Sequence, residues 1–592
     1  MPNQSKSTGA SPKEFRGESA ATPLGNDPNA DRVAPYVNTE CTCSAHLPLP
    51  QASKLMIPAA CVILLLLAVY SVLLYQGLPQ EWTTKSNEHH EVVEKFDEYD
   101  HPPYFMIAPF AILLLAIAIL PLIPVTEHWW EKNTNKFIVA ASLGAITFLY
   151  YLLACNFPVE QHFPYHDVIL PDSGGFTIAK TVFCNAILNE FFPFIVLLFS
   201  LFTITGGIRI AGNLRATPFV NSVILLIGAL LASFIGTTGA AVLLIRLLLE
   251  TNKERKFKVH TIVFFIFCVC NCGGCLTPLG DPPLFLGYLR GVDFFWTFNL
   301  WTQWAFINLT LIFLYFLWDS LWYYPREAAQ NKQRDRGVKT SISISGWQLN
   351  VPLLLGVVAA VAFLDPSKSI PGTDVHPPFY LREAVQLGLV ALSLLFSSTL
   401  IRKANAFNFL AIGEVVALFV GIFICMQAPL QILNTEGKKI VDYASKATGL
   451  EKPVLFFWST GSLSAVLDNA PTYVVFFETA RSFLPNSMEE LMSDPRHHQL
   501  DDGKWYQFDD DGKKIGQVVP VGKGFIEFHL LAAVSLGAVF MGAMTYIGNG
   551  PNFMIKAIAE QDGVKMPSFF GYMVYSCLIL LPLLAVMTIL FL

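Results

Sequence analysis

Apolar stretches of about 20 residues, the length that a helix needs to cross the hydrocarbon core of a bilayer, recur along the chain from Leu55 to Leu592. Backbone N–H and C=O groups find no water in lipid, so a spanning segment of this kind has to be helical. Hydrophobic residues make up 53% of the 592 residues and charged residues only 14%, a balance outside the usual range of soluble domains. The sequence therefore predicts an all-α polytopic membrane protein whose main partner is the lipid bilayer.

Eleven of these stretches have the length and composition of single spans. Two longer apolar segments, 218–250 and 453–480, carry Gly, Pro, Thr, Asn or Asp near the middle, a pattern typical of re-entrant hairpins. We therefore expect about eleven transmembrane helices and two re-entrant hairpins. The predicted spans are 55–76, 104–125, 137–155, 186–205, 259–278, 296–322, 347–364, 384–400, 410–427, 528–547 and 569–592.

The distribution of basic residues predicts the orientation. If the N-terminal tail is cytoplasmic, the loops on its side hold 17 Lys and Arg residues in 85 positions, against 16 in 165 positions on the other side. Short cytoplasmic loops are enriched in basic residues. We therefore expect a cytoplasmic N-terminus and an external C-terminus, in the cell (cytoplasmic or inner) membrane.

Residues 1–54 are rich in Pro, Ser, Asn and Ala and lack periodicity. This composition predicts a disordered cytoplasmic tail. The first apolar stretch starts too far along the chain for a cleaved signal peptide, so we expect it to remain as an anchor.

The same order of elements occurs twice. A span opened by an acidic residue, Glu190 or Glu414, is followed by one of the two hairpins and then by a span interrupted by Gly and Pro. Pro removes a backbone donor and clashes within a helix, so both interrupted spans should unwind. The predicted domains are the tail (1–54), N-terminal spans that form part of a scaffold (55–185), a first repeat (186–322) with hairpin 218–250 and broken helix 259–290, a cytoplasmic loop with central spans (323–409), and a second repeat (410–592) with hairpin 453–480, polar insert 481–527 and broken helix 528–560.

Basic residues also indicate that the two copies have opposite orientations. Arg209, Arg215 and the cluster 253–258 place both ends of the first hairpin at the cytoplasm, whereas both ends of the second lie on the other side. This predicts an inverted-topology repeat with two discontinuous helices. In such repeats the helix breaks meet near the bilayer midplane and form the binding site.

Three segments carry a family resemblance: Cys272–Pro283 (CGGCLTPLGDPP), Ser464–Thr472 (SAVLDNAPT) and Gly542–Asn552 (GAMTYIGNGPN). They resemble signature loops of the ion transporter superfamily, and more narrowly of its citrate-transporter-like and NhaD-type sodium/proton antiporter branch, over about residues 104–592. The resemblance implies eleven spans and two re-entrant hairpins divided into a scaffold and a moving transport unit, in a homodimer that forms through the scaffold.

The helix breaks and hairpin tips hold the candidate site. Ionisable groups inside lipid are costly, so each one is a functional candidate, and Asp281 and Asp468 lie at such breaks. Freed carbonyls and polar side chains around them supply the oxygen ligands that Na+ prefers. The predicted ion- or substrate-binding residues are Thr237, Thr238, Thr277, Gly280, Asp281, Asp468, Asn469, Thr472, Thr545, Asn549 and Asn552, and the candidate proton carriers are Asp281, Asp468, Glu190 and Glu414.

This residue set favours exchange of Na+ (or Li+) for H+ by alternating access. Burial disfavours the charged form of a carboxylate, so protons and sodium ions can compete for it near neutral pH. The alternative is Na+-coupled symport of citrate, a dicarboxylate or another small anion, which the carboxylate of Asp468 at one hairpin tip disfavours. We expect Na+ and H+ as transported ions, with no cofactor, no structural metal and no nucleic-acid partner.

Structural roles compete with the functional ones. Asp281 could cap the half-helix that follows it, and Glu190 and Glu414 could face headgroups or pair with a base such as Arg246. Glu478 and Arg481, three residues apart, are expected to form a surface pair. An intramembrane metal or redox enzyme would have to use the clustered cysteines, whose spacing matches no zinc or iron–sulfur pattern, so we expect a transporter and not an enzyme. These cysteines are Cys268, Cys270, Cys272 and Cys275.

Overall fold

A computed structural model describes residues 51–88, 101–165, 167–337, 340–370, 373–485, 488–500, 504–508, 513–522 and 524–592. Residues 1–50 of the predicted tail lie outside the described residues, and residues 51–54 begin helix α1 (Gln51–Tyr75). Helices dominate the described chain. Short strands pair in three small antiparallel sheets.

Seven helices in the described residues are long and apolar enough to cross a membrane, or eight if α18 (Leu410–Cys425) and α19 (Gln427–Thr448), which meet at a 44° bend, count as one span. Large apolar side chains on their outer faces are exposed, such as Leu65 at 65% and Leu578 at 72%, as contact with lipid requires. These helices make the chain a multi-pass membrane protein, and the count of eleven stays a prediction. The seven are Met56–Tyr75, Tyr104–Leu122, Asn133–Leu153, Gly175–Thr205, Pro218–Ile235, Trp296–Arg326 and Phe569–Phe591.

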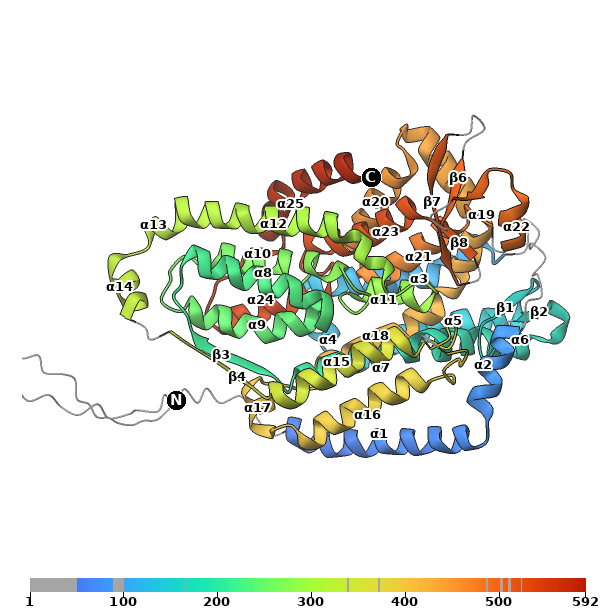
Figure 1. The fold of residues 1–592 in the computed structure, drawn as a ribbon, viewed down its shortest axis with the longest axis horizontal. Coiled ribbons are helices and arrows are strands. Elements are labelled where there is room, and N and C mark those ends of the chain that lie inside the picture. Colours follow the sequence, from blue (N-terminus) through green and yellow to red (C-terminus); the bar gives the residue numbers. More distant parts are fainter. Residues whose placement is uncertain are drawn as a thin grey trace, which may run out of the picture. The chain divides into compact units, whose positions relative to one another are not determined.

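One set of helices packs together in what we call the span group. Within it α5 packs along α18, α7 packs against α15 and α16, and α1 packs against α16 (Figure 1). A π-helical segment, η4, joins α6 to α7 and contacts α18. The span group consists of α1, α3 (Ala108–Ile119), α5 (Asn133–Leu153), α6 (Gly175–Cys184), η4 (Asn185–Phe191), α7 (Phe192–Thr205), α15 (Trp347–Phe363), α16 (Leu381–Phe396) and α18.

A second set, the hairpin group, contains both predicted hairpins and both predicted broken helices. The pairs α8 and α9, α20 and α23, and α11 and α21 pack side by side (Figure 1). The two groups meet where α7 packs against α9, and also at α11, where Tyr288 Oη donates to Val361 O of α15 at 2.6 Å. The hairpin group consists of α8 (Pro218–Ile235), α9 (Thr237–Thr251), α10 (Val259–Cys268), α11 (Pro282–Leu289), α12 (Trp301–Trp318), α20 (Lys452–Ser464), α21 (Asn469–Arg481), α23 (Phe528–Met541), α24 (Gly550–Gln561) and α25 (Phe569–Phe591).

Connections complete the chain. The strands β3 and β4 join the segments that follow α7 and precede α15 in an antiparallel ladder, and α19 leads from α18 to pack on α21. The connecting elements are α2 (Leu78–Glu88), α4 (Pro124–Trp130), α13 (Tyr324–Arg326), α14 (Ala329–Gly337), α17 (Thr399–Ala404), α22 (Met488–Ser493), β1 (Val159–Gln161), β2 (Asp167–Ile169), β3 (Arg209–Asn213) and β4 (Ser341–Ser345).

The chain reverses and unwinds where Gly and Pro predicted it. Gly236, at φ +81°, alone separates α8 from α9, and only a residue without a Cβ adopts that conformation easily. Each broken helix ends in a short 3-10 turn, η5 (Cys272–Cys275) after α10 and η8 (Gly542–Met544) after α23, before the chain resumes as α11 or α24. These interruptions leave backbone groups without helical partners deep in the molecule.

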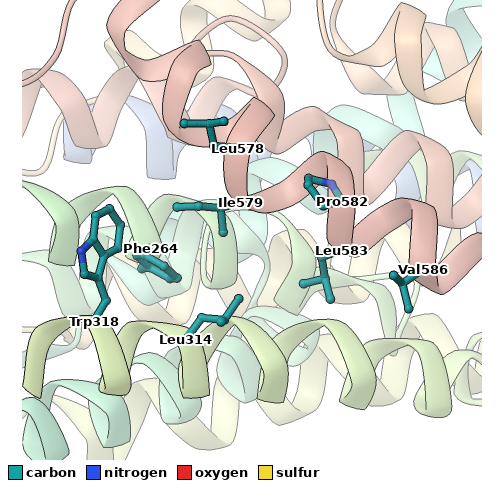
Figure 2. Close-up of a pocket in the computed structure, with 8 residues that line it drawn as sticks. All are labelled: Phe264, Leu314, Trp318, Leu578, Ile579, Pro582, Leu583 and Val586. Atoms are coloured by element: carbon teal, nitrogen blue, oxygen red, sulfur yellow. The ribbon is translucent and has the colours of Figure 1, made fainter. Parts of the chain in front are cut away.

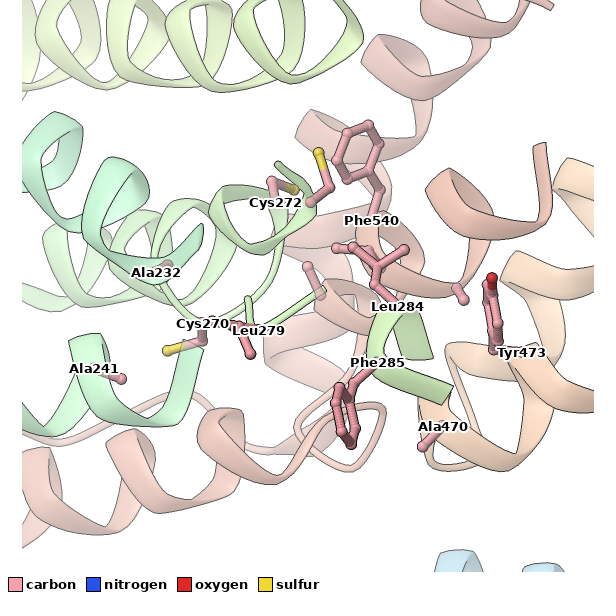
Figure 3. Close-up of a cluster of buried hydrophobic side chains, with 14 of the residues drawn as sticks. Ala232, Ala241, Cys270, Cys272, Leu279, Leu284, Phe285, Ala470, Tyr473 and Phe540 are labelled. Carbon is pink, nitrogen blue, oxygen red and sulfur yellow. The ribbon is translucent and has the colours of Figure 1, made fainter. Parts of the chain in front are cut away.

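Both breaks lie in the main hydrophobic core. Figure 3 shows Cys270 beside Leu279 in the first break and Cys272 near Phe540 of α23, with Leu284 and Phe285 of α11 in the same hydrophobic cluster. The four clustered cysteines are fully buried free thiols, and they pack as small apolar side chains do.

The polar insert contains a four-stranded antiparallel sheet, which the sequence analysis did not predict. Its strands follow chain order, β5 (His497–Gln499), β6 (Trp505–Phe508), β7 (Lys514–Val521) and β8 (Gly524–Glu527), and β8 continues directly into α23. Leu484, Leu491, Val518 and Phe525 form a small core of its own.

An apolar groove of about 430 Å³ runs between α12 and α25. Phe264, Leu314 and Trp318 face five side chains of α25 across it (Figure 2). The groove shares no residue with the predicted site, and no charged side chain lines it.

Candidate functional site

The Asp281 carboxylate is the centre of the polar contacts in the first helix break. Asp281 is 1% exposed. Its Oδ1 accepts hydrogen bonds from Thr237 Oγ1 at 3.0 Å and Asn549 Nδ2 at 3.2 Å, and its Oδ2 accepts one from Asn469 Nδ2 at 2.6 Å. We call these four residues the Asp281 cluster; all four belong to the predicted site.

Each member of the Asp281 cluster comes from the N-terminal end of a different helix. Thr237 and Asn469 are the first residues of α9 and α21, and Asp281 and Asn549 are the N-cap residues of α11 and α24. Helix N-termini carry partial positive charge, so four of them stabilise negative charge at this point. Although Asp281 occupies an N-cap position, its side chain makes no capping hydrogen bond, and the capping explanation is therefore wrong.

The Asp281 carboxylate has neutral partners only. No Lys, Arg or His nitrogen of the described chain lies within 4.0 Å of it. A buried carboxylate without a base is costly as a bare charge. The helix N-termini offset part of that cost, and a proton or a cation can offset the rest.

Asn469 adds an oxygen without a partner. Its Nδ2 donates to Asp281, but its fully buried Oδ1 has no hydrogen-bond partner within the described structure. Buried polar atoms in proteins are almost always paired. An unpaired amide oxygen beside a carboxylate is therefore suited to bind a cation or a proton on that carboxylate.

Asn271 belongs to the site, although the sequence analysis did not select it. Its Oδ1 accepts from Asn549 Nδ2 at 3.2 Å, and its Nδ2 donates to Ile266 O at 2.9 Å and Asn552 Oδ1 at 2.7 Å. Asn552 in turn donates to Gly542 O and Thr545 O. A polar residue in the apolar cysteine-rich stretch was the signal that could have identified Asn271.

The two breaks repeat the same bracing contacts. Thr277 Oγ1 donates to Ser233 O near the end of α8, and Thr545 Oγ1 donates to Ala465 O at the end of α20. Gly280 approaches the carbonyl of Gly274, as Gly548 approaches that of Gly542. Thr277, Gly280 and Thr545 therefore hold the breaks against the hairpins. In addition, Gly280 O accepts from the backbone N–H of Thr237 at 2.8 Å.

Three other predicted residues lie around the tips of the hairpins. Asp468 is half-buried and caps α21, with its Oδ1 accepting from Ala470 N at 3.4 Å. Thr472 Oγ1 donates to Asp468 O at 3.0 Å, and Thr238 is half-buried in the first turn of α9. Asp468 is thus adjacent in sequence to a member of the Asp281 cluster, and among the described residues it makes no hydrogen bond to Asp281.

Glu190 and Glu414 lie outside the Asp281 cluster, each paired with a base. Arg290 Nη2 lies 2.9 Å from Glu190 Oε2, and Lys136 Nζ lies 2.5 Å from Glu414 Oε1. Glu190 is 9% exposed, whereas the Glu414 side chain is 48% exposed. The predicted carboxylates therefore differ: Asp281 has no basic partner among the described residues, and these two have one each.

Glu478 and Arg481 form the expected i, i+3 ion pair, but the expectation that this pair lies at the surface is wrong. Glu478 is 6% exposed, and its Oε1 accepts from Arg290 Nε at 3.0 Å. Arg481 lies farther away, at 3.7 Å. Sequence spacing found the i, i+3 neighbour but not the residue from another helix that binds Glu478.

Comparison with known families gives a match over most of the chain. Residues 99–592 match the family model CitMHS_2, whose description is "Putative citrate transport". The matched segment contains both hairpins, both broken helices and the whole Asp281 cluster. A comparison with curated proteins finds no match to the chain.

Proposed function

Since the chain belongs to the family described as "Putative citrate transport", we propose that it is a secondary active transporter in which Asp281 binds the coupling ion, and that its net reaction exchanges Na+ (or Li+) for H+. The family match confirms the citrate-transporter-like resemblance of the three signature segments. The observation that carries the proposal is a buried carboxylate that three neutral donors hold and that has no basic partner among the described residues.

Asn469 fits both ionic states of Asp281. Its Nδ2 donates to the bare carboxylate, as described above. After rotation of the amide, its Oδ1 accepts from the protonated carboxyl group or binds a sodium ion that the carboxylate also binds. The Thr237 hydroxyl, which can donate and accept, serves either state in the same way.

The repeated contacts of the two breaks support an inverted repeat. We propose that α8–α9 and α20–α21 are re-entrant hairpins that enter from opposite faces, with the N-terminus cytoplasmic and the C-terminus outside a cell membrane. In this arrangement the helix breaks meet within the bilayer, and alternating access exposes them to each side in turn. Asp468 is then a second carboxylate close to the pathway, and a homodimer is the proposed assembly.

Cation-coupled citrate symport is the second candidate. Two observations favour it: the description of the family and the four helix N-termini at the Asp281 cluster, which favour an anion. In this reading Asp281 carries the coupling cation, and the citrate carboxylates bind at the other N-termini.

Everted membrane vesicles that hold a proton gradient distinguish the two reactions. For antiport, added Na+ or Li+ dissipates the gradient between about pH 6 and pH 9, and Asp281→Asn abolishes the response while the amount of protein stays unchanged. For symport, right-side-out vesicles accumulate labelled citrate when Na+ is supplied. Retention of full activity by Asp281→Asn in whichever assay responds would reject the role of Asp281.

A further inference from the structure

Arg290 binds two buried glutamates from different parts of the chain. Its Nη2 donates to Glu190 Oε2 at 2.9 Å and its Nε to Glu478 Oε1 at 3.0 Å, and the Arg290 side chain is only 8% exposed. The residues are 100 and 188 positions apart from Arg290 in sequence. Charge-assisted bonds to a planar guanidinium are among the strongest side-chain hydrogen bonds.

The bond to Glu190 crosses from one group of helices to the other. Glu190 lies in the π-helical segment η4, which packs against α6, α7 and α18 of the span group. Arg290 caps the end of α11, which packs against α21 and α23 of the hairpin group, and Glu478 lies in α21. The bond to Glu478 therefore joins two elements of the same group, and the bond to Glu190 joins the two groups. A π-helical turn in a long span often marks a functional site.

We propose that the Arg290–Glu190 ion pair is a latch that holds the hairpin group to the span group in this conformation and opens when the hairpin group moves. The inference rests on the proposed function, because alternating access requires the cation-binding elements to move relative to the rest of the protein.

The Arg290–Glu190 ion pair can break while Arg290 stays paired with Glu478. When the groups separate, Arg290 keeps its bond to Glu478, whose other oxygen lies 3.7 Å from Arg481. Of these charged residues, Glu190 loses its basic partner. A buried unpaired carboxylate is unfavourable, so this charge opposes separation, and a neutral residue at position 190 would weaken that opposition.

The insert contacts the residue that follows Arg290. Gly522, in the turn between β7 and β8, donates its backbone N–H to Gly291 O at 3.3 Å, one residue beyond Arg290. This contact places the latch at the end of α11 that faces the insert. Breaking the ion pair should therefore change the hydrogen–deuterium exchange of the backbone amides around this end.

Hydrogen–deuterium exchange of the full chain in lipid nanodiscs tests the latch without measuring transport. In Glu190→Gln we expect the amides of α11 and α21 to exchange about tenfold faster than in the unmodified protein. The matched control is Lys136→Gln, which breaks the ion pair between α5 and α18 inside the span group and should leave α11 and α21 unchanged. Glu190→Asp keeps the charge on a shorter side chain and should give an intermediate effect.

Unchanged exchange of α11 and α21 in both Glu190→Gln and Glu190→Asp would overturn the latch, as would an equal increase in Lys136→Gln. If Glu190→Gln does not fold, the comparison of Glu190→Asp with Lys136→Gln decides. If neither Na+/H+ antiport nor citrate uptake is detected but the hydrogen–deuterium exchange of the variants is as expected, only the proposed function is rejected.

Discussion

Asn549 donates to the Asp281 carboxylate at 3.2 Å, and the two residues occupy equivalent positions, the N-caps of α24 and α11, 268 residues apart. The same offset relates Thr277 to Thr545 and Gly280 to Gly548. Where the other pairs are identical, this one combines an acid with an amide. One ionisable group is therefore bound by its neutral counterpart, which suits a cluster that handles one proton or one monovalent cation.

Replacement of Asn271 should disturb this pair. Asn271→Leu removes the acceptor for Asn549 and the donor to Asn552 Oδ1, and loss of a buried partner of this kind costs about 1 to 3 kcal/mol. We expect lower thermal stability together with a higher Na+ concentration for half-maximal transport. Asn308→Leu is the control, because Asn308 is equally buried but donates to Cys272 O and Trp304 O and to no member of the Asp281 cluster. It should lower stability alone; equal changes in Na+ dependence for both variants would remove Asn271 from the site.

Gly280 should tolerate no side chain. A Cβ at this position would overlap the carbonyl of Gly274, whereas a Cβ at Gly550 would meet nothing within 4 Å. We expect Gly280→Ala to reduce the yield of folded protein, because backbone atoms in the packed break cannot yield as a flexible side chain can. Gly550→Ala, in the first turn of α24, should be neutral or slightly stabilising. Melting curves of the purified variants compare the two, and similar melting temperatures would contradict the close packing at Gly280.

Arg402 should stabilise the C-terminal ends of two helices through hydrogen bonds to their carbonyl groups, and not through a carboxylate partner. Its guanidinium is 1% exposed and donates to Thr203 O near the end of α7, and to Ser393 O and Oγ near the end of α16. Helix C-termini carry partial negative charge, which compensates the buried cation. Arg402→Met should lower the free energy of unfolding by about 2 to 3 kcal/mol. The exposed neighbour Lys403 provides the control, since Lys403→Met should change stability by less than about 0.5 kcal/mol; a similar loss in both variants would refute this role.

The attachment of the insert should depend on pH through Glu527. Burial raises the pKa of this carboxyl group to about 7, and the charge of Lys452 opposes the rise. The folded form therefore binds a proton that the unfolded form, with an ordinary pKa of 4.5, releases, so stability is lost as pH rises from 4.5 towards 7. Protection of the β7 and β8 amides, measured as the intrinsic exchange rate at each pH divided by the observed rate, should be lower at about pH 8 than at about pH 5.5. In Glu527→Gln this pH dependence should disappear; its persistence would assign it to another group.

The sequence by itself determined the class of protein and the places where its helices break. Hydropathy identifies lipid-exposed helices because each satisfies its own backbone hydrogen bonds within a local segment. Gly and Pro act on the backbone of their own residues, so the tip at Gly236 and the breaks before Pro282 and Pro551 could be placed without any partner. All four members of the Asp281 cluster were selected in this way.

Only the tertiary structure decided which carboxylates have a basic partner. Glu190, Glu414 and Asp281 look alike as single acids in apolar sequence, but their partners lie 100, 278 and up to 268 residues away. The roles of Asn271 and Arg290 and the sheet in the insert depend on contacts of the same kind. The charge state and hydrogen bonds of a side chain depend on the groups that pack against it. A local sequence pattern does not predict how distant segments pack together.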